Sequence, residues 1–306
     1  MNMKSSNPTV VCFGEILWDN LPTRRNPGGA PMNVAYHLNR LGVNAAIISA
    51  LGDDEPGREL LRFLKDKGVS AEFVQVDPEH QTSEVSASVS QDHEVSYVIH
   101  SDVAWDYILA DEKSKEAVAH ASAFVFGSLS ARNLESRETL FSLLAYSKYN
   151  VFDVNLRAPH YSPELIKQLM QHADLLKVNA SELQLIAEWH NCQATNELEI
   201  IQILFSQYKM TDVVVTKGST GASLYTRNAH IDSPAYQVPV QDTIGSGDSF
   251  LAALLAKKLS HASVEDALDH AVAMGAFITG KSGACPEYNQ HEFERFMKET
   301  KAKLRL

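Results

Sequence analysis

Short apolar runs recur along this chain and alternate with segments of helical spacing. The runs are rich in β-branched residues, which is the pattern of strands buried on both faces, and they cover residues 9–13, 45–49, 123–126, 149–152 and 212–216. Between the first two runs, Val34, Leu38 and Leu41 share one helical face before Gly42. Strands that alternate with helices predict right-handed βαβ units around a mostly parallel sheet. The fold class expected is therefore α/β.

Residues 72–100 follow another pattern, in which apolar and polar positions alternate with a period of two. Such alternation is typical of strands with one wet face and one dry face. We expect a small antiparallel sheet, inserted into one α/β domain over residues 1–306. Its dry face needs a partner, which is the substrate, the main domain or a second subunit; the last of these predicts a homodimer.

The composition of the chain indicates its cellular compartment and limits the kinds of partner it can bind. The formal net charge of −11 argues against nucleic acid or an anionic membrane as a partner. The three cysteines form no C-x-x-C pair, which favours reduced thiols in a cytoplasmic protein. Residues 1–8 lack the apolar stretch of a signal peptide, and no run approaches the length of a membrane span.

The segment from Asp242 to Ala256 carries the most chemical information. It reads Asp-Thr-Ile-Gly-Ser-Gly-Asp and then becomes helical. Small residues at 245–247 let backbone amides approach an anion, and a helix N-terminus adds its positive dipole end. A carboxylate at Asp248 is well placed to accept a proton from an attacking hydroxyl. The alternative is a tight turn in which Asp248 or Ser249 only caps the helix.

Two motifs together resemble a known family. Gly-Gly-Ala-Pro-Met-Asn-Val-Ala at residues 28–35 and the segment 242–248 look like the two signatures of the ribokinase-like (PfkB) carbohydrate kinases. Residues 14–19, 103–106 and 153–157 resemble the fructokinase branch of that family. The resemblance implies a three-layer α/β/α fold with a β lid formed by segments of about 14–26 and 71–105. It also implies transfer of the γ-phosphate of ATP to a monosaccharide, with fructose as the expected acceptor.

The resemblance assigns roles to the residues of the two signatures and the lid. Asp248 would be the general base, the amides of Gly245, Ser246 and Gly247 would form an anion hole, and Arg157 would contact the ATP phosphates. Sugar hydroxyls would be bound by four residues of the first signature region: Asp19, Gly28, Gly29 and Asn33. Tyr97 and Ile99 would cover the sugar or form part of a dimer interface, although half-buried strand packing explains both equally well. Asp19 also fits an exposed turn and Asn33 a helix cap.

The same resemblance implies a nucleotide and metal set. Asn179 and Glu182 would act through water on Mg²⁺ and phosphate, although they also fit a helix start. Thr216, Gly218 and Gly221 would enclose the nucleotide, although a hairpin that contains glycine is an adequate alternative. Asp242 and Ile244 stand where some relatives hold a monovalent cation such as K⁺. Val272 departs from relatives that carry asparagine near the purine.

A second phosphate motif is rejected on its context. Residues 275–282 satisfy the Walker A pattern letter for letter. A P-loop needs a buried strand before it and a helix after it. Here residues 264–277 have helical spacing, and Pro286 blocks a following helix.

The competing functions differ in acceptor or in class. The favoured function is a fructokinase whose partners are ATP and a small sugar. A neighbouring function replaces fructose with ribose, 2-keto-3-deoxygluconate or a nucleoside. A third is a sugar-binding regulator without catalysis, which would not need the carboxylate at 248.

Overall fold

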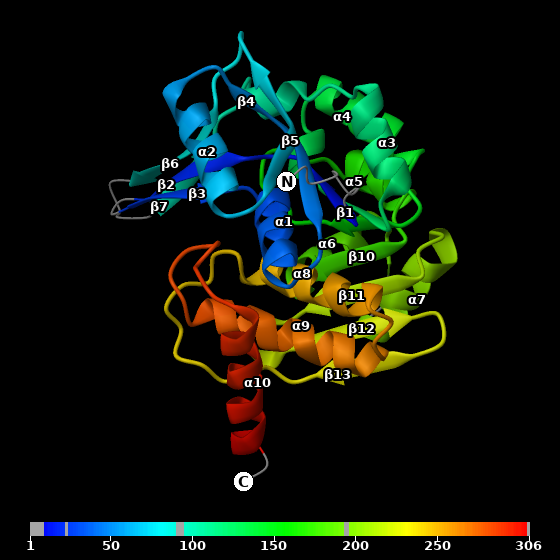
Figure 1. Cartoon of the computed structure of the whole chain (residues 1–306). Coiled ribbons are helices and arrows are strands. Elements are labelled where there is room, and N and C mark those ends of the chain that lie inside the picture. Colours follow the sequence, from blue (N-terminus) through cyan, green and yellow to red (C-terminus); the bar gives the residue numbers. More distant parts are fainter. Residues whose placement is uncertain (1–8, 22–23, 90–94, 193–195, 305–306) are drawn as a thin grey trace. The chain divides into compact units, whose positions relative to one another are not determined.

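The computed structural model describes residues 9–21, 24–89, 95–192 and 196–304, with residues 21, 24, 87–89, 95–97 and 301–304 described by their backbone alone. The chain divides into two compact units (Figure 1). Unit 1 comprises residues 1–125 and 130–148, and unit 2 comprises residues 126–129 and 149–306. Strand β8 (Ala123–Gly127) is divided between the units.

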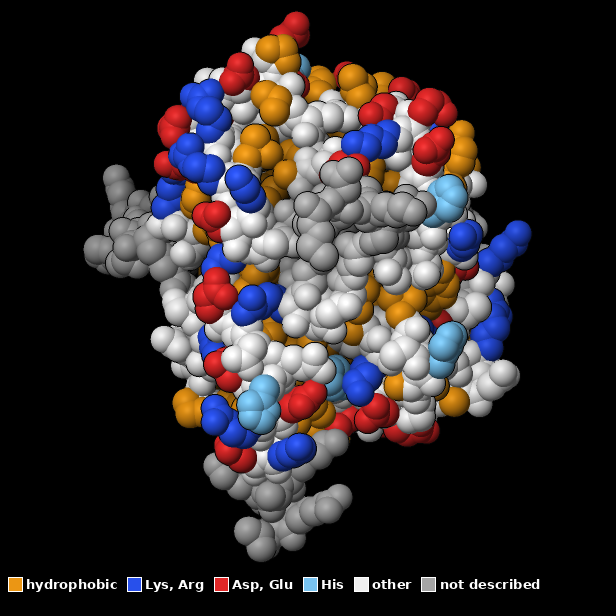
Figure 2. All heavy atoms as spheres, viewed as in Figure 1, with side chains coloured by type: hydrophobic (Ala, Val, Ile, Leu, Met, Phe, Trp, Pro, Cys, Tyr) orange, Lys and Arg blue, Asp and Glu red, His pale blue; other side chains and the backbone are white. Residues whose placement is uncertain are grey.

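Unit 1 contains three parallel strands in the order β1-β4-β5, namely β1 (Val10–Phe13), β4 (Ala45–Gly52) and β5 (Ser70–Asp77). Every residue of β1 and β4 is buried, as their continuous apolar runs predict. Four helices accompany them: α1 (Ala30–Arg40), α2 (Glu55–Asp66), α3 (Glu112–His120) and α4 (Leu134–Leu144). On the face shown in Figure 2, acidic and basic side chains lie next to one another over α2, where Arg58 and Arg62 pair with Glu55.

Unit 1 also holds the small sheet, in the order β3-β2-β6-β7. Its strands are β2 (Leu17–Leu21), β3 (Arg24–Gly28), β6 (Ser83–Val89) and β7 (Val95–Ile99). The outer pairs are antiparallel as expected, but β2 and β6 pair in parallel. Residues 70–77, where the second predicted lid segment of 71–105 begins, form β5 and pair in parallel with β4. Alternation at 72–77 comes from the half-exposed position of an edge strand.

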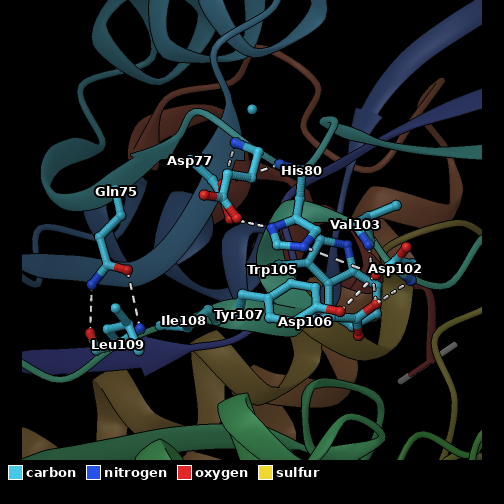
Figure 3. A network of polar contacts seen from close by, with 12 residues as sticks. Gln75, Asp77, His80, Asp102, Val103, Trp105, Asp106, Tyr107, Ile108 and Leu109 are labelled. Carbon is cyan, nitrogen blue, oxygen red and sulfur yellow. Dashed lines mark hydrogen bonds and ion pairs between the residues drawn. The ribbon is translucent and has the colours of Figure 1, made fainter.

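Residues 102–109, which follow β7, are held to the rest of unit 1 by a network of polar contacts (Figure 3). The His80 ring stacks on Tyr107 at 3.7 Å and bonds Asp77 at 2.8 Å. The side-chain amide of Gln75 bonds both backbone groups of Leu109. In the buried turn η1 (Ala104–Tyr107), Asp106 accepts two hydrogen bonds from Arg132, whose guanidinium lies 4.0 Å from the Trp105 ring. These contacts fix the point where the small sheet returns to the core.

Unit 2 contains three parallel strands, β9 (Asn150–Asp153), β10 (Leu175–Asn179) and β11 (Asp212–Thr216). Two antiparallel strands, β12 (Ala222–Thr226) and β13 (His230–Ser233), extend the sheet beyond β11. Its helices are α5 (Pro163–Met170), α6 (Ala180–Trp189), α7 (Glu197–Gln207), α8 (Ser246–Leu259), α9 (Val264–Thr279) and α10 (Gln290–Leu304). The predicted α/β class with a mostly parallel sheet and a smaller, mainly antiparallel one is confirmed.

Candidate active site

The helices of this protein begin in two different ways. In α2 to α7 and in α9, an Asp, Asn or Ser side chain at the N-cap accepts a backbone N–H of the first turn. By contrast, α1 and α8 begin at Gly29 and Gly245, each with positive φ and no side-chain cap. Both glycines belong to the two signatures found in the sequence. The first-turn N–H groups that other helices satisfy with their own side chains are left to other partners here.

The start of α8 has the geometry of an anion site. Gly245 has a φ of 74°, and a Cβ there would lie 2.7 Å from the Cα of Ala284, so only glycine fits. The Ser246 hydroxyl donates to the carbonyl of Thr243, which fixes the turn before the helix. Asp248 follows in the first turn and is partly exposed. The structure therefore brings together the four predicted residues 245–248, with the carboxylate beside the helix N-terminus.

A buried cation lies next to this turn. Lys177, in the middle of β10, is 7% exposed, and its Nζ donates to both carboxylate oxygens of Asp153 at 2.8 Å. A Cβ at residue 247 would stand 3.4 Å from this Nζ. Burial opposes the charged form, but Asp153, with further contributions from Asp248 and Glu182, raises the pKa of Lys177 above its ordinary value. Lys177 was not predicted as a site residue; a lysine inside an apolar run was the available signal.

A cavity of about 360 Å³ opens beside the same turn. Thr216, Gly218 and Gly221, predicted to enclose a nucleotide, line it together with Ser246 and Gly247. The remainder of its wall is mainly apolar, and it includes Tyr236, Val238, Val240, Phe250, Val272, Gly275 and Ala276. A cavity with one apolar wall and one helix N-terminus suits a ligand that has an apolar ring and an anionic group.

The Thr216–Gly221 segment is also the hairpin that the sequence offered as an alternative. It joins β11 to β12, and the short turn η3 (Gly218–Thr220) closes with Gly221 N–H donating to Gly218 O. The hairpin and the cavity wall are one structure here, so the two interpretations do not compete.

Asn179 and Glu182 form a reciprocal cap on α6. The Asn179 side chain accepts the Glu182 N–H at 2.9 Å, and the Glu182 carboxylate accepts the Asn179 N–H at 2.8 Å. The second Glu182 oxygen accepts the N–H of Leu156 at 2.9 Å. Burial raises the pKa of Glu182 above its usual range, although these N–H groups oppose the shift. Glu182 is thus a buried carboxyl group whose two oxygens are each held by a backbone N–H group.

The two remaining groups of unit 2 lie in loops. Arg157 is exposed in the loop after β9, one residue beyond the Leu156 amide that bonds Glu182. Asp242 accepts the N–H of Ile244 and of Gly283, both at 3.0 Å. Asp242 thus joins the segment before α8 to the loop after α9. The monovalent-cation role of Asp242 and Ile244 stays a prediction.

The predicted sugar residues lie in unit 1. Asp19, in β2, is partly buried, and a Cβ at Gly28 would overlap its Oδ2, so the carboxylate lies directly against the Gly28 backbone. Gly29, with a φ of 113°, passes equally close to the carbonyl of Glu15. Asn33 is buried in α1, and its backbone N–H donates to Gly29 O. Asn33 therefore lies inside the helix and does not cap it.

Ile99 and Tyr97 lie in β7, paired with Val85 and Ala87. The side chain of Ile99 is partly exposed, whereas the side chain of Tyr97 falls outside the described residues.

Rejection of the Walker A motif is confirmed. Residues 264–279 form helix α9, so Gly275 lies inside a helix. Lys281 lies just beyond, with its Nζ 4.7 Å from the Phe277 ring.

Comparison with known proteins places these features in a family. The model of the pfkB family carbohydrate kinases matches residues 9–291. Fructokinase-2 of Solanum lycopersicum is 30% identical over 318 residues, covering 94% of both chains, and Fructokinase-1 of Zea mays is 30% identical, covering 93% of this chain and 95% of the other. The fold resembles a fructokinase with bound ATP from Xylella fastidiosa, with a TM-score of 0.85, 23% identity and coverage of 97% of this chain and 100% of the other. A Vibrio cholerae fructokinase with bound fructose, ADP and calcium ion gives a TM-score of 0.79, 25% identity and coverage of 95% and 100%.

Proposed function

This chain belongs to the pfkB family of carbohydrate kinases, and from that premise we propose that it transfers the γ-phosphate of ATP to a hydroxyl of fructose. It is a phosphotransferase that acts on a sugar hydroxyl. The curated relatives reported above bear fructokinase names, which supports fructose as the acceptor.

The observation that carries the nucleotide assignment is the cavity beside α8. Its apolar wall suits the base, and Ser246 and Gly247 at the uncapped helix start suit the phosphates. Gly218 and Gly221 in the hairpin turn let the backbone approach closely. We assign ATP to this cavity.

Asp248 accepts the proton of the attacking hydroxyl as the bond to phosphorus forms. The N–H groups at 245–248 stabilise the negative charge that develops on the transferred phosphoryl group, because a preorganised donor costs no reorganisation. Lys177 keeps positive charge beneath this turn. Arg157 contacts the ATP phosphates from its exposed loop.

Mg²⁺ fits this site as a metal held by phosphate and water. No group of three or more His, Cys, Asp or Glu side chains suited to a metal occurs in the described part of the chain. Mg²⁺ commonly keeps several waters and binds through substrate phosphates. Glu182 and Asn179 would contact those waters, and the ion would neutralise charge on the β- and γ-phosphates.

A coupled ADP-release assay with MgATP tests the acceptor. Fructose, ribose, glucose, 2-keto-3-deoxygluconate and adenosine are compared at equal concentrations, with kcat/KM measured for each active sugar. We expect the highest kcat/KM with fructose. A higher value with ribose or 2-keto-3-deoxygluconate would move the acceptor and keep the kinase, whereas no ADP release with any sugar would contradict the function itself.

No helix in the described residues is long and apolar enough to cross a membrane. The cytoplasmic location remains our proposal, to be checked by fractionation of cells that express the chain.

A further inference from the structure

The small sheet of unit 1 has two unlike faces. Cross-strand partners place Asn26, Asp19, Val85 and Ile99 in one row, since Asp19 pairs with both Asn26 and Val85, and Val85 pairs with Ile99. Directly paired residues point to the same side of a sheet. Two residues predicted to contact sugar, Asp19 and Ile99, therefore share a face with Asn26, which neither signature includes.

The opposite face is internally satisfied. The Asn20 amide donates to Glu84 at 2.8 Å, and Arg25 pairs with Glu84 at 2.6 Å and with Glu59 at 2.8 Å. The indole N–H of Trp18 donates to the carbonyl of Pro56 at 3.1 Å. The side-chain nitrogens named here thus find their partners within unit 1.

Asn26 differs from Asn20 in this respect. Its Nδ2 is shielded from solvent, yet it has no hydrogen-bond partner among the described residues. Leaving a buried donor unpaired is unfavourable, so such groups in native proteins call for an explanation. Asp19 on β2 pairs with Asn26, and the Asp19 carboxylate lies against Gly28.

We propose that the Nδ2 amide of Asn26 binds the substrate and, with the Asp19 carboxylate opposite it, holds one hydroxyl of the sugar. A hydroxyl donates one hydrogen bond and accepts others. The carboxylate accepts its O–H while the amide donates to its oxygen, so the pair recognises a hydroxyl more completely than either group alone. Asn26 is then a residue that selects among sugars. This inference rests on the proposed sugar kinase function.

A buried water is the competing partner for Nδ2, since waters commonly satisfy such groups. A buried water and a substrate hydroxyl predict different effects when the Asn26 amide is removed. A structural water links Asn26 to the fold alone, so its loss affects stability. A substrate hydroxyl links Asn26 to sugar affinity and to one position on the sugar ring.

The test is steady-state kinetics of Asn26→Ala and of the near-isosteric Asn26→Asp, with Asn20→Ala as the matched control. Asn20 lies on the neighbouring strand and the opposite face, with its amide paired to Glu84. We expect Asn26→Ala to raise the sugar KM about tenfold, equivalent to about 1.4 kcal/mol, with the ATP KM within twofold of wild type. Asn20→Ala leaves the sugar KM within twofold. If Asn26→Ala does not fold, the sugar KM of Asn26→Asp is measured instead, because this variant removes the N–H donor and keeps the shape of the side chain.

Monodeoxy analogues of the sugar sharpen the assignment. Removing the hydroxyl that Asn26 and Asp19 hold should weaken binding by the wild type clearly more than binding by Asn26→Ala, because the variant loses only the contact with Asp19 and contacting groups are not additive. Equal losses for all analogues in both proteins, or an unchanged sugar KM in Asn26→Ala, would overturn the inference while the kinase stands. A wild type that releases no ADP with any sugar would overturn the proposed function and this inference with it.

Discussion

Helices α6 and α8 of unit 2 both begin at residues that were predicted to act on phosphate. The first turn of α6 has a side-chain cap, whereas the first turn of α8 has none. In α6, Asn179 and Glu182 exchange hydrogen bonds across the first turn. In α8, Gly245 supplies no side chain to the first turn. A capped helix start satisfies a first-turn donor with its own side chain, whereas α8 has no side-chain cap and its Ser246 N–H donates to the backbone carbonyl of Thr243.

The two helix starts suit different roles in a phosphate site. The start of α8 is suited to contact phosphate directly, because its donors, its dipole and the cavity coincide. The start of α6 is suited to support the site through water and through the loop that carries Arg157, which Glu182 holds at Leu156. A motif that matches a family pattern can therefore act by stabilising the backbone around a ligand.

Lys177 connects the two helix starts, so its removal should have the largest effect on stability. It lies on β10, which leads into α6, and its Nζ lies beside Gly247 of α8. Lys177→Met leaves Asp153 buried without its partner, which costs about 3–5 kcal/mol, measured by urea unfolding. The control Lys258→Met, which breaks a more exposed pair with Asp212, should cost about 1 kcal/mol.

The pH dependence of this cost follows from the raised pKa of Lys177. A lysine with a raised pKa in the folded state contributes its full stabilisation below its ordinary pKa and loses it only at higher pH. The cost of Lys177→Met should therefore not fall between pH 6 and pH 8. A cost that falls away between these values would contradict a charged, paired lysine.

Gly245→Ala tests the open start of α8. The new Cβ would meet the Ala284 backbone at 2.7 Å and displace the turn, and a displacement of about 1 Å can reduce catalysis about 10²-fold. The control is Gly283→Ala, at a φ of 77° with no atom within 4 Å of the added Cβ. Both variants bear the cost of positive φ, so similar kcat/KM values for ATP would show that the close packing of Gly245 is unimportant.

Asn179→Ala tests the capped start of α6. Loss of the cap costs about 1 kcal/mol of stability, as should Asn196→Ala, which removes the cap of α7. If Asn179 also contacts waters of Mg²⁺, only Asn179→Ala raises the KM for MgATP, by a few-fold. Equal KM values in the two variants would leave Asn179 as a cap alone.

Lys281→Ala should have the smallest effect. Its ammonium group lies over Phe277, a contact of about 0.5–1 kcal/mol, and we expect kcat/KM for ATP within twofold of wild type. Loss of ATP binding in a folded Lys281→Ala protein, measured by calorimetry, would restore the Walker A interpretation.

Sequence patterns predicted the elements whose burial is uniform. β1 and β11 lie within one residue of the predicted runs, because their residues meet apolar neighbours on both sides. β10 was missed, because Lys177 interrupts its apolar run and pairs with Asp153 on a neighbouring strand. The second predicted lid segment, 71–105, begins inside β5, because this half-exposed strand beside β4 alternates as the strands of the small sheet do.

The candidate site shows the same division. The start of α8 at Gly245 and the place of Asp248 in its first turn were predictable, because helix starts impose local sequence rules. Lys177 and Asn26 were not, because their roles depend on partners that only the fold brings opposite them.

We propose Asp248, at the open start of α8, as the general base, and Asp248→Asn removes that base while it keeps the size of the side chain. The control is Asp266→Asn, another first-turn acid, on the capped helix α9. Turnover with MgATP and sugar and sugar affinity by calorimetry are measured for both. We expect Asp248→Asn to bind sugar nearly as the wild type does while its turnover falls at least ~10²-fold, and we expect Asp266→Asn to be unchanged. Turnover of Asp248→Asn within tenfold of wild type would contradict it.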